Sequence, residues 1–194
     1  EMNEQYRPYD YLMRTGQMIG QHFGLETAGF FEDETDIANS DQHVFSQVRP
    51  GDIKYVDQND DGVINEYDVI PIGYSAELPE IYYSAALGFE YKGIGAEVLV
   101  QGTANQTEYL NTKSLFWPLR DQNTVSAAYA SRWTPETSET AELPRLSLLD
   151  NANNYRKNDI WLTNAGYLKI RYVEVYYRFP DHLLEKISSE SLKL

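Results

Sequence analysis

Residues 81–102 read IYYSAALGFEYKGIGAEVLVQG, and this stretch decides the fold expected of the chain. Within 81–91 apolar side chains alternate with small or polar ones, and 94–102 alternates in the same way. Lys92-Gly93 between the two runs is a turn signal. The pattern therefore predicts an antiparallel hairpin with strands over 81–91 and 94–102. The apolar face of its first strand comprises Tyr83, Ala85, Leu87, Phe89 and Tyr91.

The predicted strands have a length that matters for function. Each arm has roughly nine to eleven residues, which is what a tilted strand needs to cross a bilayer. A soluble β-sandwich with half-exposed sheets alternates equally well. Periodicity alone leaves both architectures open.

Two further segments alternate. Residues 17–28 do so less cleanly, because Gln21 and Thr27 dilute the apolar face. Residues 166–179 begin in one phase and continue in the other. A single extra residue near Arg171–Tyr172, a β-bulge, would restore one apolar face. We therefore predict strands over 17–28 and 166–179, with the bulge in the second, and a further strand beginning near 188–194.

Between these strands, residues 29–80 and 103–165 are polar and show no sustained period. Stretches this long exceed the usual connection of about 4–6 residues, so they are either functional loops or a sign that the elements within them are wrongly assigned. A short turn at one end of the strands and long loops at the other is the asymmetry of outer-membrane barrels.

Composition excludes several classes of function. The 194 residues include 16 Lys+Arg and 30 Asp+Glu, a formal net charge of −14, which repels phosphate backbones and argues against nucleic-acid binding. The absence of cysteine removes disulfides and thiolate metal sites. No apolar run approaches the ~18 residues of a spanning helix, and residues 1–10 lack the basic start and apolar run of a signal peptide.

The sharpest local motif is DQNDDGVINEYD at 57–68. Its spacing matches the twelve-residue calcium loop, with Gly62 at the sharp turn. Oxygen-bearing side chains at alternate positions can surround one calcium ion. An Asp/Asn/Gly-rich turn without any metal has the same composition. The candidate calcium ligands are Asp57, Asn59, Asp61, Val63 through its carbonyl, Asn65 and Asp68.

Catalytic motifs are absent. The histidines have no ligand spacing, and no nucleophile elbow, zinc-protease motif or glycine-rich phosphate loop occurs, so we expect no enzymatic activity. Trp117, Trp133 and Trp161 lie in or next to the second long loop and are candidates to stack on a sugar substrate. Buried anchoring of that loop is the alternative role for these rings.

Several stretches together resemble the SusC/RagA family of TonB-dependent outer-membrane transporters. Residues 51–73 (GDIKYVDQNDDGVINEYDVIPIG) resemble the family's G-D-[IV]-K-Y-x-D-x-N-x-D-G-x-I run. Residues 87–102 are similar to its tyrosine-lysine-glycine hairpin, 131–146 to its R-W-T-P-E segment followed by P-R, and 164–187 to its A-x-Y-L-[RK]-[IL]-[RK] strand. Asp60 and Gly166 depart from the family pattern, which often has glycine and serine there, without altering the ligand spacing or the strand phase.

The resemblance implies an all-β fold: antiparallel strands of a large transmembrane β-barrel of about 22 strands, with long extracellular loops at 29–80 and 103–165. Residues 1–194 would be only part of that barrel, because the family's plug domain is absent and its last hairpins lie beyond the chain. Too few strands are present to close a barrel, since the smallest membrane barrels have about 8.

The implied function is import of large nutrients, glycans or peptides, across the outer membrane of a Gram-negative, Bacteroidota-like bacterium. The implied partners are a SusD-like surface lipoprotein, outer-membrane lipid, and the TonB complex through the missing N-terminal part. Calcium at 57–68 would stiffen the first loop. The alternative is a soluble secreted β-sandwich that binds carbohydrate and carries a calcium-type loop, in which Leu87 and its neighbours would face a core rather than lipid.

Overall fold

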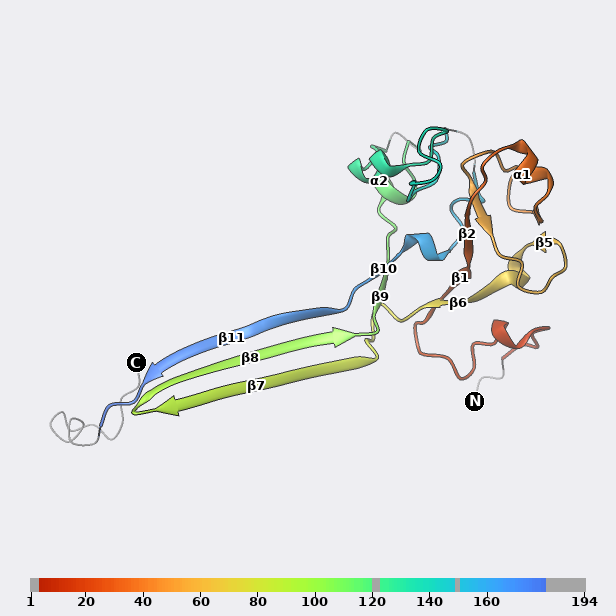
Figure 1. Ribbon diagram of the computed structural model, residues 1–194. Coiled ribbons are helices and arrows are strands. Elements are labelled where there is room, and N and C mark those ends of the chain that lie inside the picture. Colours follow the sequence, from red (N-terminus) through yellow and green to blue (C-terminus); the bar gives the residue numbers. More distant parts are fainter. Residues whose placement is uncertain (1–3, 120–122, 149–150, 181–194) are drawn as a thin grey trace. The chain divides into compact units, whose positions relative to one another are not determined.

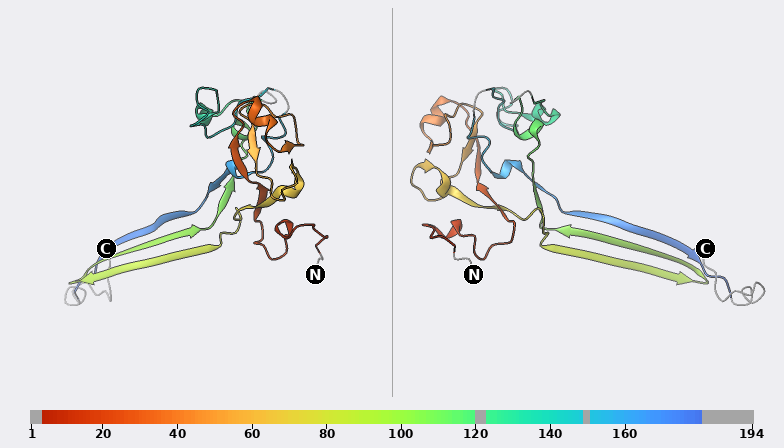
Figure 2. Two further views of the ribbon diagram at one scale, coloured as in Figure 1. Left: turned by 45° about the vertical axis from the view of Figure 1, so that its right-hand side comes forward. Right: turned by 180° about the vertical axis from the view of Figure 1, so that it is seen from behind.

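A computed structural model describes residues 4–119, 123–148 and 151–180 (Figures 1 and 2). The described residues form an all-β structure with a few short helices, and the chain divides into two compact units. Unit 1 comprises Glu1–Leu78 and Thr107–Asn164, and unit 2 comprises Pro79–Gln106 and Ala165–Leu194. The strand expected to begin near 188–194 lies outside the described residues.

Unit 2 is built on a three-stranded antiparallel sheet in the order β11-β8-β7. Its strands are β7 (Ile81–Tyr91), β8 (Ile94–Ala104) and β11 (Tyr167–Tyr177), each of 11 residues. The predicted hairpin is confirmed, with Ile81 opposite Ala104 and Tyr91 opposite Ile94. Its two turn residues, Lys92 and Gly93, have φ of 51° and 85°, as the two-residue hairpin turn that matches strand twist requires.

The predicted bulge is also confirmed. Ile170 pairs with Val100 and Tyr172 with Leu99, so the register shifts across Arg171. The extra residue brings Val173 and Val175 onto the face that Leu168 and Ile170 occupy before the shift. One residue therefore keeps a single apolar face along the whole of β11.

Among its described residues, unit 1 contains four pairs of short strands. Three pairs are antiparallel: β1 (His22–Leu25) with β6 (Val69–Gly73), β2 (Thr27–Phe30) with β4 (Ile53–Tyr55), and β9 (Thr107–Tyr109) with β10 (Leu162–Asn164). The parallel pair is β3 (Gln42–His43) with β5 (Val63–Ile64). The helices are α1 (Glu34–Ala38), α2 (Lys113–Phe116) and short 3-10 turns at Asp10–Leu12, Glu66–Asp68, Ala127–Ser131 and Asp159–Trp161.

Two sequence predictions are corrected here. Residues 17–28 do not form one strand: β1 begins at His22, the chain leaves it at Glu26, and β2 follows. Both strands pair within unit 1 rather than with the long sheet. The ranges 29–80 and 103–165 are not loops throughout, because they contain β3–β6, β9 and β10. Strands of two to five residues are too short to produce a readable period.

The core of unit 1 forms where these short strands meet. Leu25, Ile53, Tyr55 and Ile64 are buried together, and Phe30, Phe45, Val69 and Ile160 pack around them. Each strand contributes only one or two of these side chains, so the core joins segments distant in sequence. No helix in the described part of the chain has the length and apolar character needed to cross a membrane.

Candidate functional site

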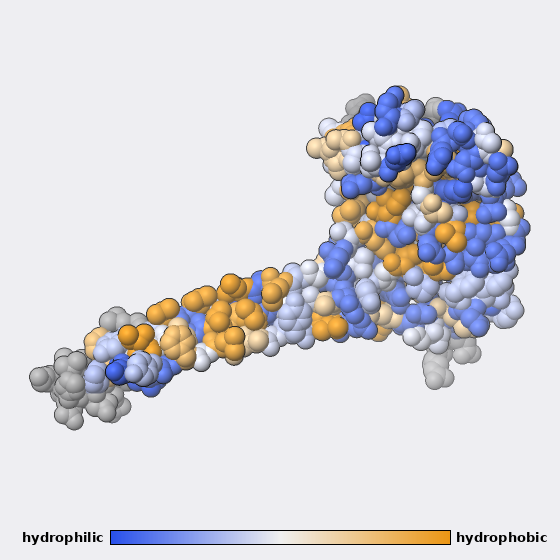
Figure 3. All heavy atoms as spheres, in the orientation of Figure 1, coloured by the Kyte–Doolittle hydropathy of each residue, from blue (hydrophilic) through white to orange (hydrophobic). Residues whose placement is uncertain are grey.

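The three-stranded sheet of unit 2 presents one continuous apolar face. Leu87 pairs with Val98 and Val98 with Val173, so the three lie in one row. Exposure along the outer strands of this face is high: Leu87 is 67% exposed, Phe89 66% and Val175 68%. Figure 3 shows apolar residues over much of this sheet. Exposed apolar area of this extent marks contact with another protein or with lipid.

The alternative of a soluble sandwich predicted that this same face would be buried in a core. Among the described residues nothing covers Leu87 or Phe89. The apolar face is therefore not part of a core formed by the described residues.

The opposite face of the sheet is polar and internally bonded. The Tyr176 hydroxyl donates to Glu90 Oε2 at 3.0 Å, and the Tyr172 hydroxyl donates to Glu97. Tyr176 reaches Glu90 across Gly95, where any Cβ would overlap the tyrosine ring. The sheet thus separates an apolar face from a face that carries hydrogen-bonded tyrosines and carboxylates.

In unit 1, the predicted calcium-type loop forms a series of tight turns. Asp57 closes it, because Asp57 Oδ2 accepts the Gly62 N–H at 2.7 Å and Oδ1 accepts the Asn59 N–H at 3.1 Å. Asn59 and Asp61 repeat this side-chain bond, each to the N–H two residues on. Gly62 has φ of 78°, so the glycine lies at a turn that other residues rarely adopt.

The end of the loop is fixed by Asp68, which is fully buried. Its oxygens accept the backbone N–H of Gln58 at 3.0 Å and of Asn65 at 2.7 Å, so it ties the start of the loop to its end. Asn65 in turn caps the short 3-10 turn that follows. Burial raises the pKa of the Asp68 carboxyl, although the two N–H bonds oppose the shift.

The donor chemistry of this loop fits calcium. All six candidate ligands are oxygen donors, which hard divalent cations prefer, and a carboxylate that accepts one N–H per oxygen keeps further lone pairs. Throughout the described ranges, however, no group of three or more His, Cys, Asp or Glu side chains is gathered as metal ligands are. Asp57 and Asp68 bond to the backbone of the loop itself.

The three tryptophans differ in their surroundings. Trp161 is fully buried and its Nε1–H donates to the Asn154 carbonyl at 3.0 Å. Trp133 is 8% exposed and lies against Gly51, where a Cβ would overlap the indole. Trp117 is partly buried and stacks on Tyr155 with ring centroids 4.4 Å apart. Trp133 and Trp161 therefore anchor unit 1, with no ring face open for a sugar.

Sequence reasoning missed a buried polar cluster around Asp52. This carboxylate is fully buried and accepts hydrogen bonds from the side-chain amides of Asn151 at 2.7 Å and Asn154 at 2.9 Å. Arg145 forms an ion pair with it, Nε to Oδ1, at 2.8 Å. The Arg49 N–H donates to Oδ2 at 2.8 Å. Every bond to the Asp52 carboxylate other than that from Arg49 joins residues more than ninety positions apart in the sequence.

The signal for this cluster was present in the motifs that suggested the family. Asp52 belongs to the G-D-I-K-Y run, Arg145 to the P-R pair and Trp133 to R-W-T-P-E. The Arg145 N–H also donates to the Gly51 carbonyl at 2.9 Å. Motifs that are far apart in sequence therefore meet in one buried junction, which gives them a structural role.

Comparisons with known proteins agree with this geometry. The chain is 26% identical over 179 residues to TonB-dependent receptor P26 of Formosa agariphila, which covers 92% of this chain and 17% of that protein. Its fold matches a chain of the RagAB peptide importer in the closed-closed state, with a TM-score of 0.52 and 18% identity over 84% of this chain and 17% of that one. No family model matches.

The chain spans about a sixth of the length of either relative. At 18% identity the match to the importer is a likeness of fold. The match to the receptor is a likeness of sequence, and it covers nearly the whole chain. Both agree with the resemblance drawn from the motifs, which is confirmed: this chain is similar to a segment of a TonB-dependent receptor.

Proposed function

We propose that this chain forms part of the membrane-spanning wall, with adjoining extracellular structure, of an outer-membrane TonB-dependent importer. The observation that carries the proposal is the apolar face of β7, β8 and β11. Each strand has 11 residues, the length of a tilted spanning strand. Contact with lipid removes the exposed side chains of Leu87, Phe89 and Val175 from water, and this transfer is favourable.

The order β11-β8-β7 leaves β7 and β11 as edge strands. In hydrocarbon an edge strand has backbone N–H and C=O groups without hydrogen-bond partners, and each such group costs several kcal/mol of free energy. The proposed wall therefore continues on both sides with further strands, in a barrel of about 22.

Placing an arginine on each face of the sheet in turn tests whether the face that carries Leu87 contacts lipid or water. In the intact protein, Leu87→Arg should lower the free energy of unfolding from lipid vesicles by roughly 2–4 kcal/mol, because it buries a cation in hydrocarbon. Ala86→Arg, its neighbour on the polar face, is the matched control and should cost under about 1 kcal/mol. Urea titration of the vesicle-inserted protein measures both. Equal costs for the two variants would contradict a lipid-facing role for Leu87.

For the whole protein we propose uptake of large nutrients, glycans or peptides, with energy from TonB and a SusD-like lipoprotein as partner at the surface of a Gram-negative, Bacteroidota-like cell. Transport rather than catalysis is supported by the similarity to a receptor and an importer. Purification of the protein from its native outer membrane should bring a SusD-like lipoprotein with it at comparable abundance. Recovery without any such lipoprotein would contradict the partner.

We also propose that calcium binds the loop at 57–68 and stiffens it. The support is the oxygen-only donor set and the turn closed by Asp57 onto Gly62. Calorimetry at millimolar calcium should show binding that Asp57→Asn weakens at least tenfold, because one carboxylate ligand is lost. Asp60→Asn is the control: it removes the same charge from the same loop at a position outside the ligand set. No heat of binding, or equal weakening by both variants, would contradict the site.

A further inference from the structure

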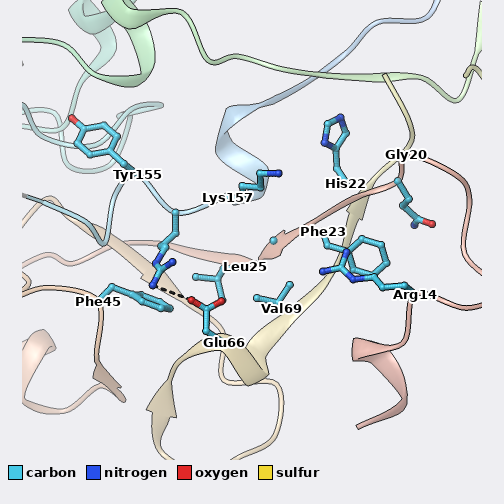
Figure 4. A pocket seen from close by; sticks show the side chains of 13 residues that line it. Arg14, Gly20, His22, Phe23, Leu25, Phe45, Glu66, Val69, Tyr155 and Lys157 are labelled. Atoms are coloured by element: carbon cyan, nitrogen blue, oxygen red, sulfur yellow. Dashed lines mark ion pairs between the residues drawn. The ribbon is translucent and has the colours of Figure 1, made fainter. Parts of the chain in front are cut away.

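Unit 1 contains a cavity of about 600 Å³ that no sequence motif indicated (Figure 4). Strand β1 forms one side of it through Phe23 and Leu25, and the segment 155–157 forms another. Gly24 lets these two come close, since a Cβ there would overlap the Lys157 carbonyl, and the Leu25 N–H donates to that carbonyl at 2.8 Å. The backbone that carries Lys157 is therefore fixed against β1.

The charge of this cavity is opposite to that of the chain. The whole chain has a net charge of −14, yet three cations, Arg14, Arg156 and Lys157, line the cavity against one carboxylate, Glu66. Such a local reversal of sign attracts an anion against the field of the surrounding protein.

The two guanidinium groups are held in place by aromatic rings. Arg14 Cζ lies 3.4 Å from the centroid of the Phe23 ring, and Arg156 Cζ lies 4.0 Å from that of Phe45. Figure 4 shows Arg14 against Phe23. Stacking fixes the plane of a guanidinium and leaves its N–H groups directed outward along their edges. The donors are thereby ordered before any ligand arrives.

The cations are only partly neutralised. Arg156 pairs with Glu66 at 3.0 Å, and its buried Nε has no hydrogen-bond partner among the described residues. Arg14 and Lys157 are exposed, and no described residue accepts a hydrogen bond from the guanidinium of the one or the ammonium of the other. An anionic group in the cavity would replace water at the exposed donors of Arg14 and Lys157 and would give the buried Arg156 Nε an acceptor.

We propose that this cavity binds the carboxylate of a small extracellular ligand, with Arg14 and Lys157 as its charged contacts. A planar carboxylate matches the planar donor edge of a guanidinium, and Lys157 adds a point charge. The volume admits a ligand larger than a single carboxylate group. This site is separate from the apolar sheet face, so a failed lipid test for Leu87 leaves it unaffected.

The test uses the intact protein in detergent at low salt, with two carboxylate probes and their neutral counterparts. The probes are galacturonate with galactose, and N-acetylglycine with N-acetylglycinamide. Calorimetry or ligand-observed NMR should show binding of at least one acid and neither neutral compound. The acid that binds distinguishes a sugar acid from a peptide carboxylate as the source.

Charge-removing variants locate the binding. Lys157→Gln and Arg14→Gln should each weaken binding of the acid about five- to tenfold. Lys113→Gln, an exposed lysine at the start of α2 and outside the cavity lining, is the control and should leave affinity unchanged. Unchanged circular dichroism of each variant verifies the fold. Absence of binding by both acids, binding of a neutral compound as tightly as its acid, or equal weakening by Lys113→Gln would overturn the proposal.

Discussion

Unit 1 and unit 2 place their apolar side chains in opposite ways. In unit 1 Phe31, Ile53, Ile64 and Trp161 are fully buried among short strands, and buried Asn and Asp side chains bond the segments together. In unit 2 the only buried positions among the described residues are Gly95, Gly102 and Thr103, while Leu87 and Val175 are open. Unit 1 therefore encloses its apolar side chains in a core, whereas unit 2 leaves them exposed on one face of its sheet.

The two units also differ in how local their bonds are. The sheet of unit 2 includes a hairpin whose strands are joined by a two-residue turn, so β7 and β8 pair without closing a long loop. Unit 1 depends on Asp52, whose partners Asn151 and Asn154 lie about a hundred residues away. Contact order is therefore high in unit 1, and removal of one buried partner should affect the whole unit.

The largest expected effect tests that dependence. Asp52→Ala should destabilise unit 1 by roughly 3–5 kcal/mol, because Arg145 and two Asn amides would lose a buried acceptor. Hydrogen exchange on the intact protein measures the loss of protection over β2 and β4. Lys54→Gln, which breaks the partly exposed pair with Asp36 at 2.7 Å, is the control and should cost under about 1 kcal/mol. Comparable costs would show that the Asp52 cluster has no special role.

The next effect tests packing on the polar face of unit 2. Gly95→Ala should cost roughly 1–3 kcal/mol, because its Cβ would overlap the Tyr176 ring. Gly88→Ala on the neighbouring strand places its Cβ 3.5 Å from the Ala96 carbonyl oxygen, an ordinary contact, and should cost little. Urea unfolding of the vesicle-inserted protein compares the two. A reduced cost of Gly95→Ala when Tyr176→Ala is also present would identify the tyrosine as the cause.

A smaller effect concerns Trp161. Trp161→Phe keeps an aromatic ring but removes the Nε1–H bond to the Asn154 carbonyl, leaving a buried acceptor without that donor. We expect a loss of about 1–2 kcal/mol in the same exchange experiment. Trp117→Phe, whose ring stacks on Tyr155 in a partly buried position, should cost less. The reverse order would argue that Trp117 is the stronger anchor.

The smallest expected effect is a pH dependence confined to unit 1. The His43 ring stacks on Tyr55, meets Phe31 edge to face, and donates from Nδ1 to Asn153 Oδ1 at 2.7 Å. Burial lowers the pKa of His43 below the ordinary 6.5, so the unfolded chain binds a proton more readily than the folded one. The neutral imidazole therefore contributes stability above pH 6.5 that is lost as the pH falls through that value toward the folded pKa.

Hydrogen exchange of unit 1 at a series of pH values, corrected for intrinsic exchange, measures this loss. His43→Gln keeps a side chain able to hydrogen-bond but cannot titrate, so its stability should be flatter between pH 5 and 7. An equally steep profile in the variant would assign the pH dependence to groups other than His43.

The sheet of unit 2 could be predicted closely from the sequence because its information is local. Alternation marks the faces, Lys92-Gly93 marks the turn, and the phase change at Arg171 marks the bulge. The single strand predicted over 17–28 is wrong, because alternation within a segment does not show which distant strand it will pair with. The partner strands β4 and β6 are too short to show a period of their own.

The sequence by itself determined the alternating faces, the turn, the bulge and the calcium-type spacing, since each depends on residues within a dozen positions of one another. Only the tertiary structure decided that Asp52, Arg145 and the Asn151–Asn154 segment share one buried junction, and that Arg14 and Lys157 line one cavity. These groups meet because distant segments fold together. The pattern of apolar and polar residues along the sequence does not indicate which distant side chains will form hydrogen bonds with a buried charge.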